Sequence, residues 1–266
     1  MNNPILRKYP SNKRLYKSSD STYEGWLSNS CIFGMAHHND PLPSIDRIPS
    51  DIINFYSFFA EGSYDILSNL IENGINENLE HLTIGFEHNN AKYGYKDYSK
   101  ISELLASTKF PKLKSFEYGI DFLLVNEEQY YPHLGDLTNV LANMPLLEEL
   151  DLSGSFKLQK KIDLKNIKKI YILDYYTEIS NGIISKETLN YLMESNFENL
   201  EEFEVSLTSD NNLTYYLNES IFRNNIDKLK CVAVDGRFEK GTKDRLITIL
   251  KPNVEKLILD EIEEDK

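Results

Sequence analysis

One spacing of apolar residues recurs along most of the chain: an apolar residue, two others, an apolar residue, one other, and a third apolar residue. Copies of this pattern begin at Leu79, Leu113, Leu147, Ile167, Leu200, Leu229 and Val254. Because alternate side chains of a strand point to opposite faces, the last two apolar residues of each copy share one face. A single strand cannot bury that face by itself. We therefore expect the copies to lie side by side in one parallel sheet.

The segments between the copies predict helices in most units. Apolar residues recur at helical spacing in four of these segments, at residues 97–108, 134–143, 185–194 and 242–250. Ser185 and Thr242 stand where helix N-caps are expected. The equivalent positions Leu150 and Ile170 are only 20 residues apart. This distance is too short for a helix with its two loops, so the unit between them is predicted to lack a helix.

The residues outside the seven copies are expected to close the ends of the array. We divide the chain into a basic segment at residues 1–17, an N-terminal cap with a degenerate first repeat at 18–78, and the repeat array with an acidic, solvated tail at 79–266. Within the cap, the apolar run 51–59 predicts a strand and residues 64–75 predict a helix. Terminal repeats are expected to be irregular because they shield the open end of the core.

The repeated spacing resembles the signature of leucine-rich repeat proteins, and the long helical inserts are similar to those of the ribonuclease-inhibitor-like class. Over residues 79–207 the chain also resembles bacterial cytoplasmic leucine-rich repeat proteins that are often encoded beside WGR-domain proteins. The segments that carry this narrower resemblance are Phe110–Leu113, Gly135–Leu137, Met144–Pro145, Leu147–Leu150 and Phe197–Glu201. The resemblance implies an α/β solenoid, a horseshoe arc with parallel strands on the concave face and helices on the convex face. It also implies a scaffold rather than an enzyme.

The charge balance is strongly acidic and uneven. The chain holds 29 Lys and Arg against 42 Asp and Glu, for a formal net charge of −13. Residues 1–17 contain no acid but five cations, namely Arg7, Lys8, Lys13, Arg14 and Lys17. The other residues therefore hold 29 − 5 = 24 cations against 42 acids, a net charge of −18. Nucleic acids and anionic membranes need cationic neutralisation, so this balance disfavours both as partners and favours a basic partner.

Sequence signals of secretion or membrane insertion are missing. No apolar run approaches the ~18 residues of a membrane span, and no apolar stretch of a signal peptide follows the basic start. The two cysteines, Cys31 and Cys231, are 200 positions apart. We therefore expect a cytoplasmic protein whose cysteines are free thiols.

Polar residues at alternate positions of the copies decide what the concave face presents. The predicted partner-binding residues on this face are Glu117, Glu149, Asp151, Tyr171, Glu202 and Glu204. Neighbouring strands lie ~4.8 Å apart, so these carboxylates would repel one another, and Lys169 is the one cation among them. The pattern leaves two interpretations open. The face is either a solvated charged surface or an acidic cradle for a basic protein partner.

Residues of catalytic or metal-binding type form few sets. His37, His38 and Asp40 are the best metal candidates, but the Cys or spaced His of a tetrahedral site is missing. Cys231 has no His or Asp close to it in the sequence. The lysines of residues 157–169 indicate either local compensation of the acidic face or a nucleic-acid patch. No phosphate loop, dinucleotide fingerprint or nucleophile elbow is present, so we expect neither cofactor nor metal.

These features favour a non-enzymatic scaffold that binds a basic protein through its acidic concave face. A concrete version is an inhibitor or immunity-type protein that neutralises a cationic toxin or nuclease. One alternative is a structural role in which the chain self-associates through exposed solenoid edges or a tyrosine-rich rim. A second alternative is a metal-dependent enzyme whose site lies around His37, His38 and Asp40.

Overall fold

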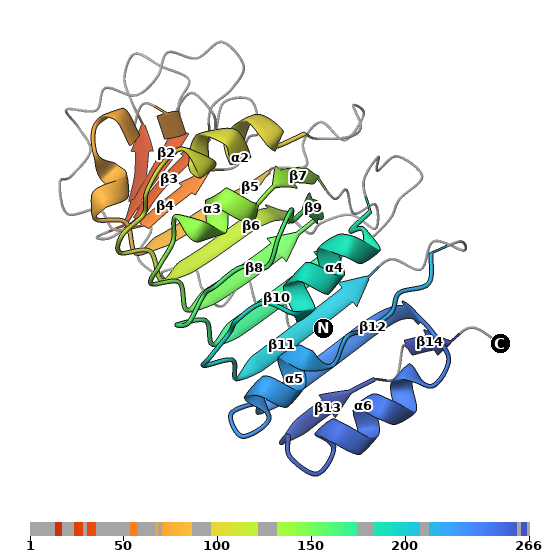
Figure 1. Cartoon of the computed structure of the whole chain (residues 1–266). Helices are drawn as coiled ribbons and strands as arrows, with labels where there is room; N and C mark the ends of the chain where they lie inside the picture. Colours follow the sequence, from red (N-terminus) through yellow and green to blue (C-terminus); the bar gives the residue numbers. More distant parts are fainter. Residues whose placement is uncertain are drawn as a thin grey trace.

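The protein has an α/β fold in which one large sheet is covered by a row of helices (Figure 1). The computed structural model describes residues 14–17, 24–28, 31–35, 54–57, 67–68, 71–86, 97–121, 132–174, 183–207, 213–259 and 262–264. Residues 1–13 and the metal candidates His37, His38 and Asp40 lie outside these segments.

The large sheet is mainly parallel. Its strands follow the order β1-β2-β3-β4-β5-β6-β8-β10-β11-β12-β13, and β14 pairs with β12 beside this path. Neighbours from β3 to β13 are parallel, whereas β1 and β3 each pair with β2 in antiparallel fashion. The strands are β1 (Arg14–Lys17), β2 (Glu24–Ser28), β3 (Cys31–Met35), β4 (Asn54–Ser57), β5 (His81–Phe86), β6 (Ser115–Asp121), β8 (Glu149–Ser153), β10 (Lys169–Asp174), β11 (Glu202–Leu207), β12 (Cys231–Phe238), β13 (Lys256–Ile258) and β14 (Ile262–Glu264).

The predicted parallel pairing is confirmed, and so is its register. The second apolar residue of each copy lies beside its counterpart in the next strand, along the row Leu82, Phe116, Leu150, Ile170, Phe203, Val232 and Leu257. All of these side chains are buried except Leu257, which lies in edge strand β13. Each interior strand is thus covered on both sides by a neighbour of the same kind, as stacked repeats require.

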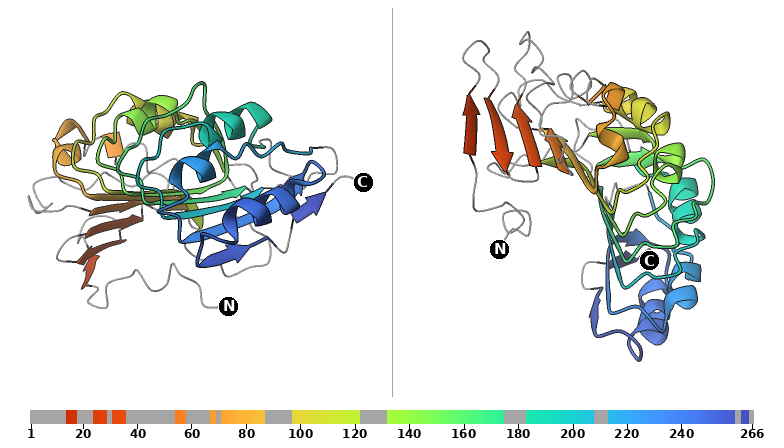
Figure 2. Two further views of the ribbon diagram at one scale, coloured as in Figure 1. Left: turned by 60° about the horizontal axis from the view of Figure 1, so that its bottom comes forward. Right: turned by 90° about the vertical axis from the view of Figure 1, so that its left-hand side faces the viewer.

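The helices lie on one side of this sheet (Figure 2). They are η3 (Ile75–Glu77), α2 (Ser99–Ala106), α3 (Thr138–Ala142), α4 (Lys186–Met193), α5 (Ser220–Asn225) and α6 (Thr242–Leu250). Helices α2, α4 and α6 confirm the predictions for residues 97–108, 185–194 and 242–250, and residues 67–68 and 71–72 are helical within the predicted range 64–75. Helix α5 was not predicted.

The segment 134–143 is only partly helical. It begins in strand β7 (His133–Asp136), which pairs with β9 (Ser155–Lys157) in a small second sheet, and only α3 follows as a helix. Leu134 lies in strand β7 and Leu137 is the N-cap residue of α3, and both side chains are buried. Their spacing is the same as that of two residues on one helix face, so the helix prediction was wrong for the first part of this segment.

The two N-cap predictions had different outcomes. Ser185 caps α4, since its side chain accepts a hydrogen bond from the Thr188 N–H at 3.1 Å. Thr242 is instead the first residue of α6, and its hydroxyl donates to the Glu239 carbonyl at 2.6 Å. The cap position is taken by Gly241, whose φ of 82° suits glycine.

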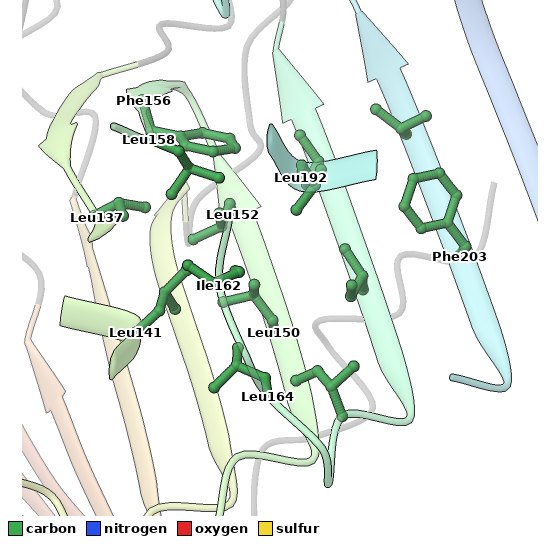
Figure 3. Close-up of a cluster of buried hydrophobic side chains, with 14 of the residues drawn as sticks. Leu137, Leu141, Leu150, Leu152, Phe156, Leu158, Ile162, Leu164, Leu192 and Phe203 are labelled. Atoms are coloured by element: carbon green, nitrogen blue, oxygen red, sulfur yellow. The ribbon is translucent and has the colours of Figure 1, made fainter. Parts of the chain in front are cut away.

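The unit between β8 and β10 contains no helix in residues 154–168, as predicted from its length. After β9 the chain stays irregular and buries Leu158, Ile162 and Leu164 in the position that helices occupy elsewhere (Figure 3). Gly154 makes the turn into this segment. Its φ is 130°, and a Cβ atom there would lie 2.2 Å from the carbonyl oxygen of Pro132. That carbonyl accepts the Ser155 N–H, so any larger residue would break the contact between β9 and β7.

The two ends of the chain differ from the predictions in part. Strand β4 lies inside the range 51–59 predicted as a strand, but the antiparallel strands β1 to β3 were not predicted. The tail 260–266 is not simply a solvated extension, because its residues 262–264 form β14 and pair with β12. The carboxylate of Glu264 also accepts the N–H groups of Gly241 and Lys243 at the start of α6. These hydrogen bonds lower the pKa of Glu264.

The stacked core predicts a large effect of a single truncation. Leu150 in central strand β8 is fully buried, so Leu150→Ala is expected to lower the free energy of unfolding by about 2–5 kcal/mol. Ile258→Ala is the matched control, because this residue is 39 % exposed in edge strand β13 and its loss should cost less than about 1 kcal/mol. Urea unfolding measures both values. Equal destabilisation by the two variants would contradict the stacked arrangement.

Candidate protein-binding face

The sheet surface opposite the helices, called the open face below, carries two rows of polar residues. The first row reads His81, Ser115, Glu149, Lys169, Glu202, Cys231 and Lys256, and the second reads Thr83, Glu117, Asp151, Tyr171, Glu204, Ala233 and Ile258. All six residues predicted for partner binding lie in these rows, on the adjacent strands β6, β8, β10 and β11. The structure therefore brings the predicted site residues together on one surface.

Lys169 lies between carboxylates of both neighbouring strands. Its ammonium group is 3.4 Å from Glu149 Oε1 and 3.7 Å from Glu202 Oε1. Five carboxylates and this one lysine occupy the two rows on strands β6 to β11. Lys169 thus compensates the first row locally, whereas on these four strands the second row contains three acids, Glu117, Asp151 and Glu204, and no lysine or arginine.

Tyr171 is fixed in the middle of the second row. Its hydroxyl donates a hydrogen bond to Glu202 Oε2 at 2.5 Å, and the side chain is half-buried. Burial raises the pKa of Tyr171 far above its usual range, and the hydrogen bond to Glu202 and the charges of Glu204 and Glu149 raise it further. The phenol therefore stays protonated and presents a rigid, neutral ring among carboxylates.

At the other end of the site, Thr83 supports Glu117. The Thr83 hydroxyl donates to Glu117 Oε2 at 3.2 Å across the β5–β6 pair. Glu204 is exposed, whereas Glu117 and Asp151 are half-buried. The exposure of the acids in the second row therefore increases along the sheet, from the half-buried Glu117 and Asp151 to the exposed Glu204.

A ladder of alternating charge runs along the beginnings of the strands, and sequence analysis missed it. The residues one position before the first row are Glu80, Lys114, Glu148, Lys168, Glu201, Lys230 and Glu255. Ion pairs join Glu80 to Lys114 at 2.8 Å, Glu148 to Lys168 at 2.6 Å, and Glu201 to Lys230 at 2.5 Å. The alternation of sign at equivalent repeat positions was the signal in the sequence that could have revealed it.

Backbone hydrogen bonds place the members of the ladder beside one another. The N–H of each member from Lys114 to Glu255 donates to the carbonyl of the preceding member at 2.7–2.9 Å. The hydrogen bonds within the pairs raise the pKa values of Lys114, Lys168 and Lys230 and lower that of Glu201. The ladder nearly neutralises itself, so the excess negative charge of the open face comes from the two rows behind it.

Four of the six lysines of residues 157–169 form ion pairs within the chain, and of these Lys169 alone pairs with acids of the two rows. Besides Lys168 and Lys169, Lys161 lies 2.7 Å from Glu194, and Lys165 lies 3.5 Å from Glu198. These cations are therefore engaged by carboxylates of the same chain.

Cys231 lies in the first row, half-buried beside Glu202. Burial raises the pKa of its thiol, Lys256 opposes this effect, and Glu202 and Glu204 add to it. Lys230, the cationic neighbour in the sequence, pairs with Glu201 instead. The surroundings therefore favour the thiol over the reactive thiolate.

Three residues of hydrolase type also meet, at the edge of the small second sheet. Asp97, His133 and Ser155 occupy neighbouring register positions, and His133 Nδ1 lies 3.0 Å from Ser155 Oγ. Ser155 is only 3 % exposed, however, and the Asp97 carboxylate accepts the Ser99 N–H. A nucleophile must be reached by substrate, so this set holds β7 and β9 together rather than forming a triad.

In the described part of the chain, no group of three or more His, Cys, Asp or Glu residues is placed to hold a metal ion. Among the same residues, no helix has the length and apolar character needed to cross a membrane.

Asp174 is a buried acid at the end of β10. It is 1 % exposed, and its Oδ2 accepts the Ile184 N–H at 2.8 Å. Burial raises its pKa from 3.8 to about 6, and the hydrogen bond from Ile184 reduces this effect. The contact joins the end of β10 to the segment that leads into α4, so Asp174 supports the fold behind the open face.

Comparison with known proteins gives a likeness in fold alone. No protein-family model matches the chain, and no curated protein is significantly similar to it. A crystal structure of a protein from Bacteroides fragilis, determined by the Northeast Structural Genomics Consortium, superposes with a TM-score of 0.50 at 16 % sequence identity. The alignment covers 91 % of this chain and 80 % of that one.

The raised pKa of Asp174 predicts how stability depends on pH. Because folding favours the protonated acid, its contribution to stability is complete below pH 3.8 and is lost as the pH rises through about 6. The difference corresponds to about 3 kcal/mol. Asp174→Asn keeps an acceptor for the Ile184 N–H and is expected to remove this loss. Urea unfolding between pH 4 and 7 measures it, with exposed Asp227→Asn as the control. Parallel profiles for wild type and Asp174→Asn would contradict the assignment.

Proposed function

We propose that the chain is a leucine-rich repeat solenoid whose concave face is the open face. The support is the parallel stack of strands in nearly unbroken register, the helices on the opposite side, and the buried irregular segment that replaces a helix between β9 and β10. Units of this kind expose one continuous row of equivalent side chains, which solenoid proteins commonly use for binding.

On this basis, the function supported best is that of a non-enzymatic cytoplasmic scaffold that binds a basic protein. The observation that carries the proposal is the gathering of the carboxylates Glu117, Glu149, Asp151, Glu202 and Glu204 on adjacent strands, with Lys169 between Glu149 and Glu202. Like charges at this spacing cost stability unless a countercharge arrives. A basic partner supplies that charge.

Tyr171 makes this face suitable for a protein partner. A half-buried ring held by a hydrogen bond loses little conformational entropy on binding and offers contact area between the carboxylates. An arginine side chain can stack on such a ring and donate to the neighbouring acids. Nucleic acid and anionic lipid would meet the same carboxylates and be repelled.

The net charge adds long-range attraction to this local site. An acidic surface accelerates association with a cationic partner and makes the rate depend on salt. A protein that inhibits or gives immunity to a basic toxin or nuclease benefits from fast association of this kind, and this is the concrete version of the proposal.

Neutralising the acidic rows is expected to abolish binding of a basic probe. The variant carries Glu117→Gln, Glu149→Gln, Asp151→Asn and Glu204→Gln, and an oligo-arginine peptide serves as the probe in calorimetry. Wild type should bind the peptide at about 50 mM NaCl and lose most of its affinity at about 500 mM, because salt screens exposed charges. The variant should lose at least about tenfold in affinity at low salt, the effect of several exposed ion pairs.

A control with the same change in net charge separates the open face from general electrostatics. It neutralises four exposed acids away from the two rows, namely Glu72, Glu103, Glu187 and Asp227. This control should retain most of the affinity. Equal losses in both variants would show that net charge alone holds the peptide, and the acidic face would then have no special role.

Edge strand β13 favours a second candidate function, self-association. It has three residues, it pairs only with β12 among the described strands, and its Ile258 is 39 % exposed. An uncovered edge can pair with another chain. Light scattering at several concentrations tests this: growth in mass that Ile258→Lys removes would support assembly, and a strict monomer would reject it.

A further inference from the structure

The open face changes in chemical character between β8 and β13. On β5, β6 and β8 every residue of the two rows is polar. From β10 onwards the second row differs, because Tyr171, Glu204, Ala233 and Ile258 follow one another on adjacent strands at one end of the sheet (Figure 1). In this part of the row, an aromatic ring and two aliphatic side chains therefore flank a single carboxylate.

The two aliphatic residues belong to the open face and not to the core behind the sheet. Ile258 is 39 % exposed, whereas its neighbour Leu257 packs against the core. Ala233 is 9 % exposed and lies outside the core cluster, which contains the residues on either side of it, Val232 and Val234. A partner on the open face can therefore contact both aliphatic side chains.

Glu204 lies between the ring and the aliphatic residues. Its side chain is exposed, and its neighbours in the row are Tyr171 on β10 and Ala233 on β12. Neither of these neighbours carries a countercharge. In the first row, by contrast, the Lys169 ammonium lies 3.7 Å from Glu202. An arginine of a partner that stacks on the Tyr171 ring can donate to Glu204 from the same position.

A second copy of this chain would cover this surface only in part. Face to face, two copies would bring their acidic rows together, and each chain has a formal net charge of −13. Edge to edge, a copy paired with β13 would cover Ile258. It would not reach Ala233 and Tyr171, which lie one and three strands further into the sheet. A partner that offers both a cation and an aliphatic side chain matches the whole of this part of the row.

The strand spacing determines how far apart these two groups must be on the partner. Neighbouring strands are ~4.8 Å apart. The point between Tyr171 and Glu204 is two strands from the point between Ala233 and Ile258, which is ~10 Å at this spacing. Two residues seven positions apart lie on one face of an α-helix, ~10.5 Å apart along its axis. A helix that crosses the strands therefore provides the required spacing.

We propose that this end of the open face is a two-part site for a helix of the basic partner. An arginine of the helix stacks on Tyr171 and pairs with Glu204, and a leucine-type side chain seven positions away covers Ala233 and Ile258. The aliphatic contact adds short-range selectivity among cationic proteins. This inference rests on the proposed function, because it names the chemistry of the partner that binds the same face.

Two alanine-based helical peptides test the site by calorimetry on the full chain at about 50 mM NaCl, where exposed charges are weakly screened. Both carry arginines on one helix face. They differ only in the residue seven positions after the last arginine, which is leucine in one peptide and glutamine in the other. Wild type should bind the leucine peptide about fivefold more tightly, the effect of burying part of an aliphatic side chain.

Three variants locate the two contacts. Ile258→Ser should remove the preference for the leucine peptide and leave the affinity for the glutamine peptide unchanged. Leu146→Ser is the matched control, because Leu146 is 44 % exposed but lies outside the two rows, and it should keep the preference. Glu204→Gln should weaken the binding of both peptides about threefold, the effect of one exposed ion pair. A preference that survives in Ile258→Ser would overturn the proposal.

The outcomes separate this inference from the proposed function. If both peptides bind wild type with equal affinity, the two-part site is wrong, and the acidic face still binds a basic probe. If neither peptide binds, the proposed function fails and the inference fails with it. Light scattering of wild type and Ile258→Ser at the same concentrations completes the test. A wild-type dimer that the substitution dissociates would assign Ile258 to a second copy and overturn the proposal.

Discussion

Parallel backbone pairing in a nearly constant register is the constraint on which the rest of this structure depends. Each strand from β5 to β13 places its equivalent residues beside those of its neighbours. If the same type of side chain occupies one position in every unit, these side chains therefore lie next to one another on adjacent strands across the sheet. An apolar residue gains from this repetition, because its neighbours cover it, whereas a charged residue is repelled unless the sign changes from strand to strand.

The chain meets this constraint differently in its three kinds of row. The row through Leu150 is apolar and forms the core. The row through Glu148 alternates in sign and pairs with itself. The rows through Glu149 and Asp151 repeat acids and contain one compensating cation on β6 to β11, Lys169. These last rows repeat acids instead of alternating in sign, and this difference is the physical reason for proposing them as the binding surface.

The rows could be predicted from the sequence because the position of a residue within the apolar motif determines to which side of the sheet its side chain points. The sequence was less informative where tertiary contacts decide. Helix α5 is short and is stabilised by the burial of Ile221 and Phe222, and the Phe222 ring packs edge to face against Phe203 of β11. Strand β7 is formed by pairing with β9. The sequence pattern of this segment does not show that partner, and by itself it predicts a helix. The charge ladder was missed for another reason: its residues stand one position outside the two rows considered for the open face.

The ladder also explains how acids can be repeated without loss of register. A slip of one residue between two strands would turn every apolar side chain to the open face, so the core alone forbids it. A slip of two residues would keep the apolar side chains inward. It would, however, separate Glu148 from Lys168 and Glu201 from Lys230. It would also break the backbone hydrogen bonds in which the carbonyl of a ladder residue accepts two successive N–H groups of the next strand. The alternating charges therefore add to the preference for the observed register, in which the neighbouring rows display their carboxylates side by side.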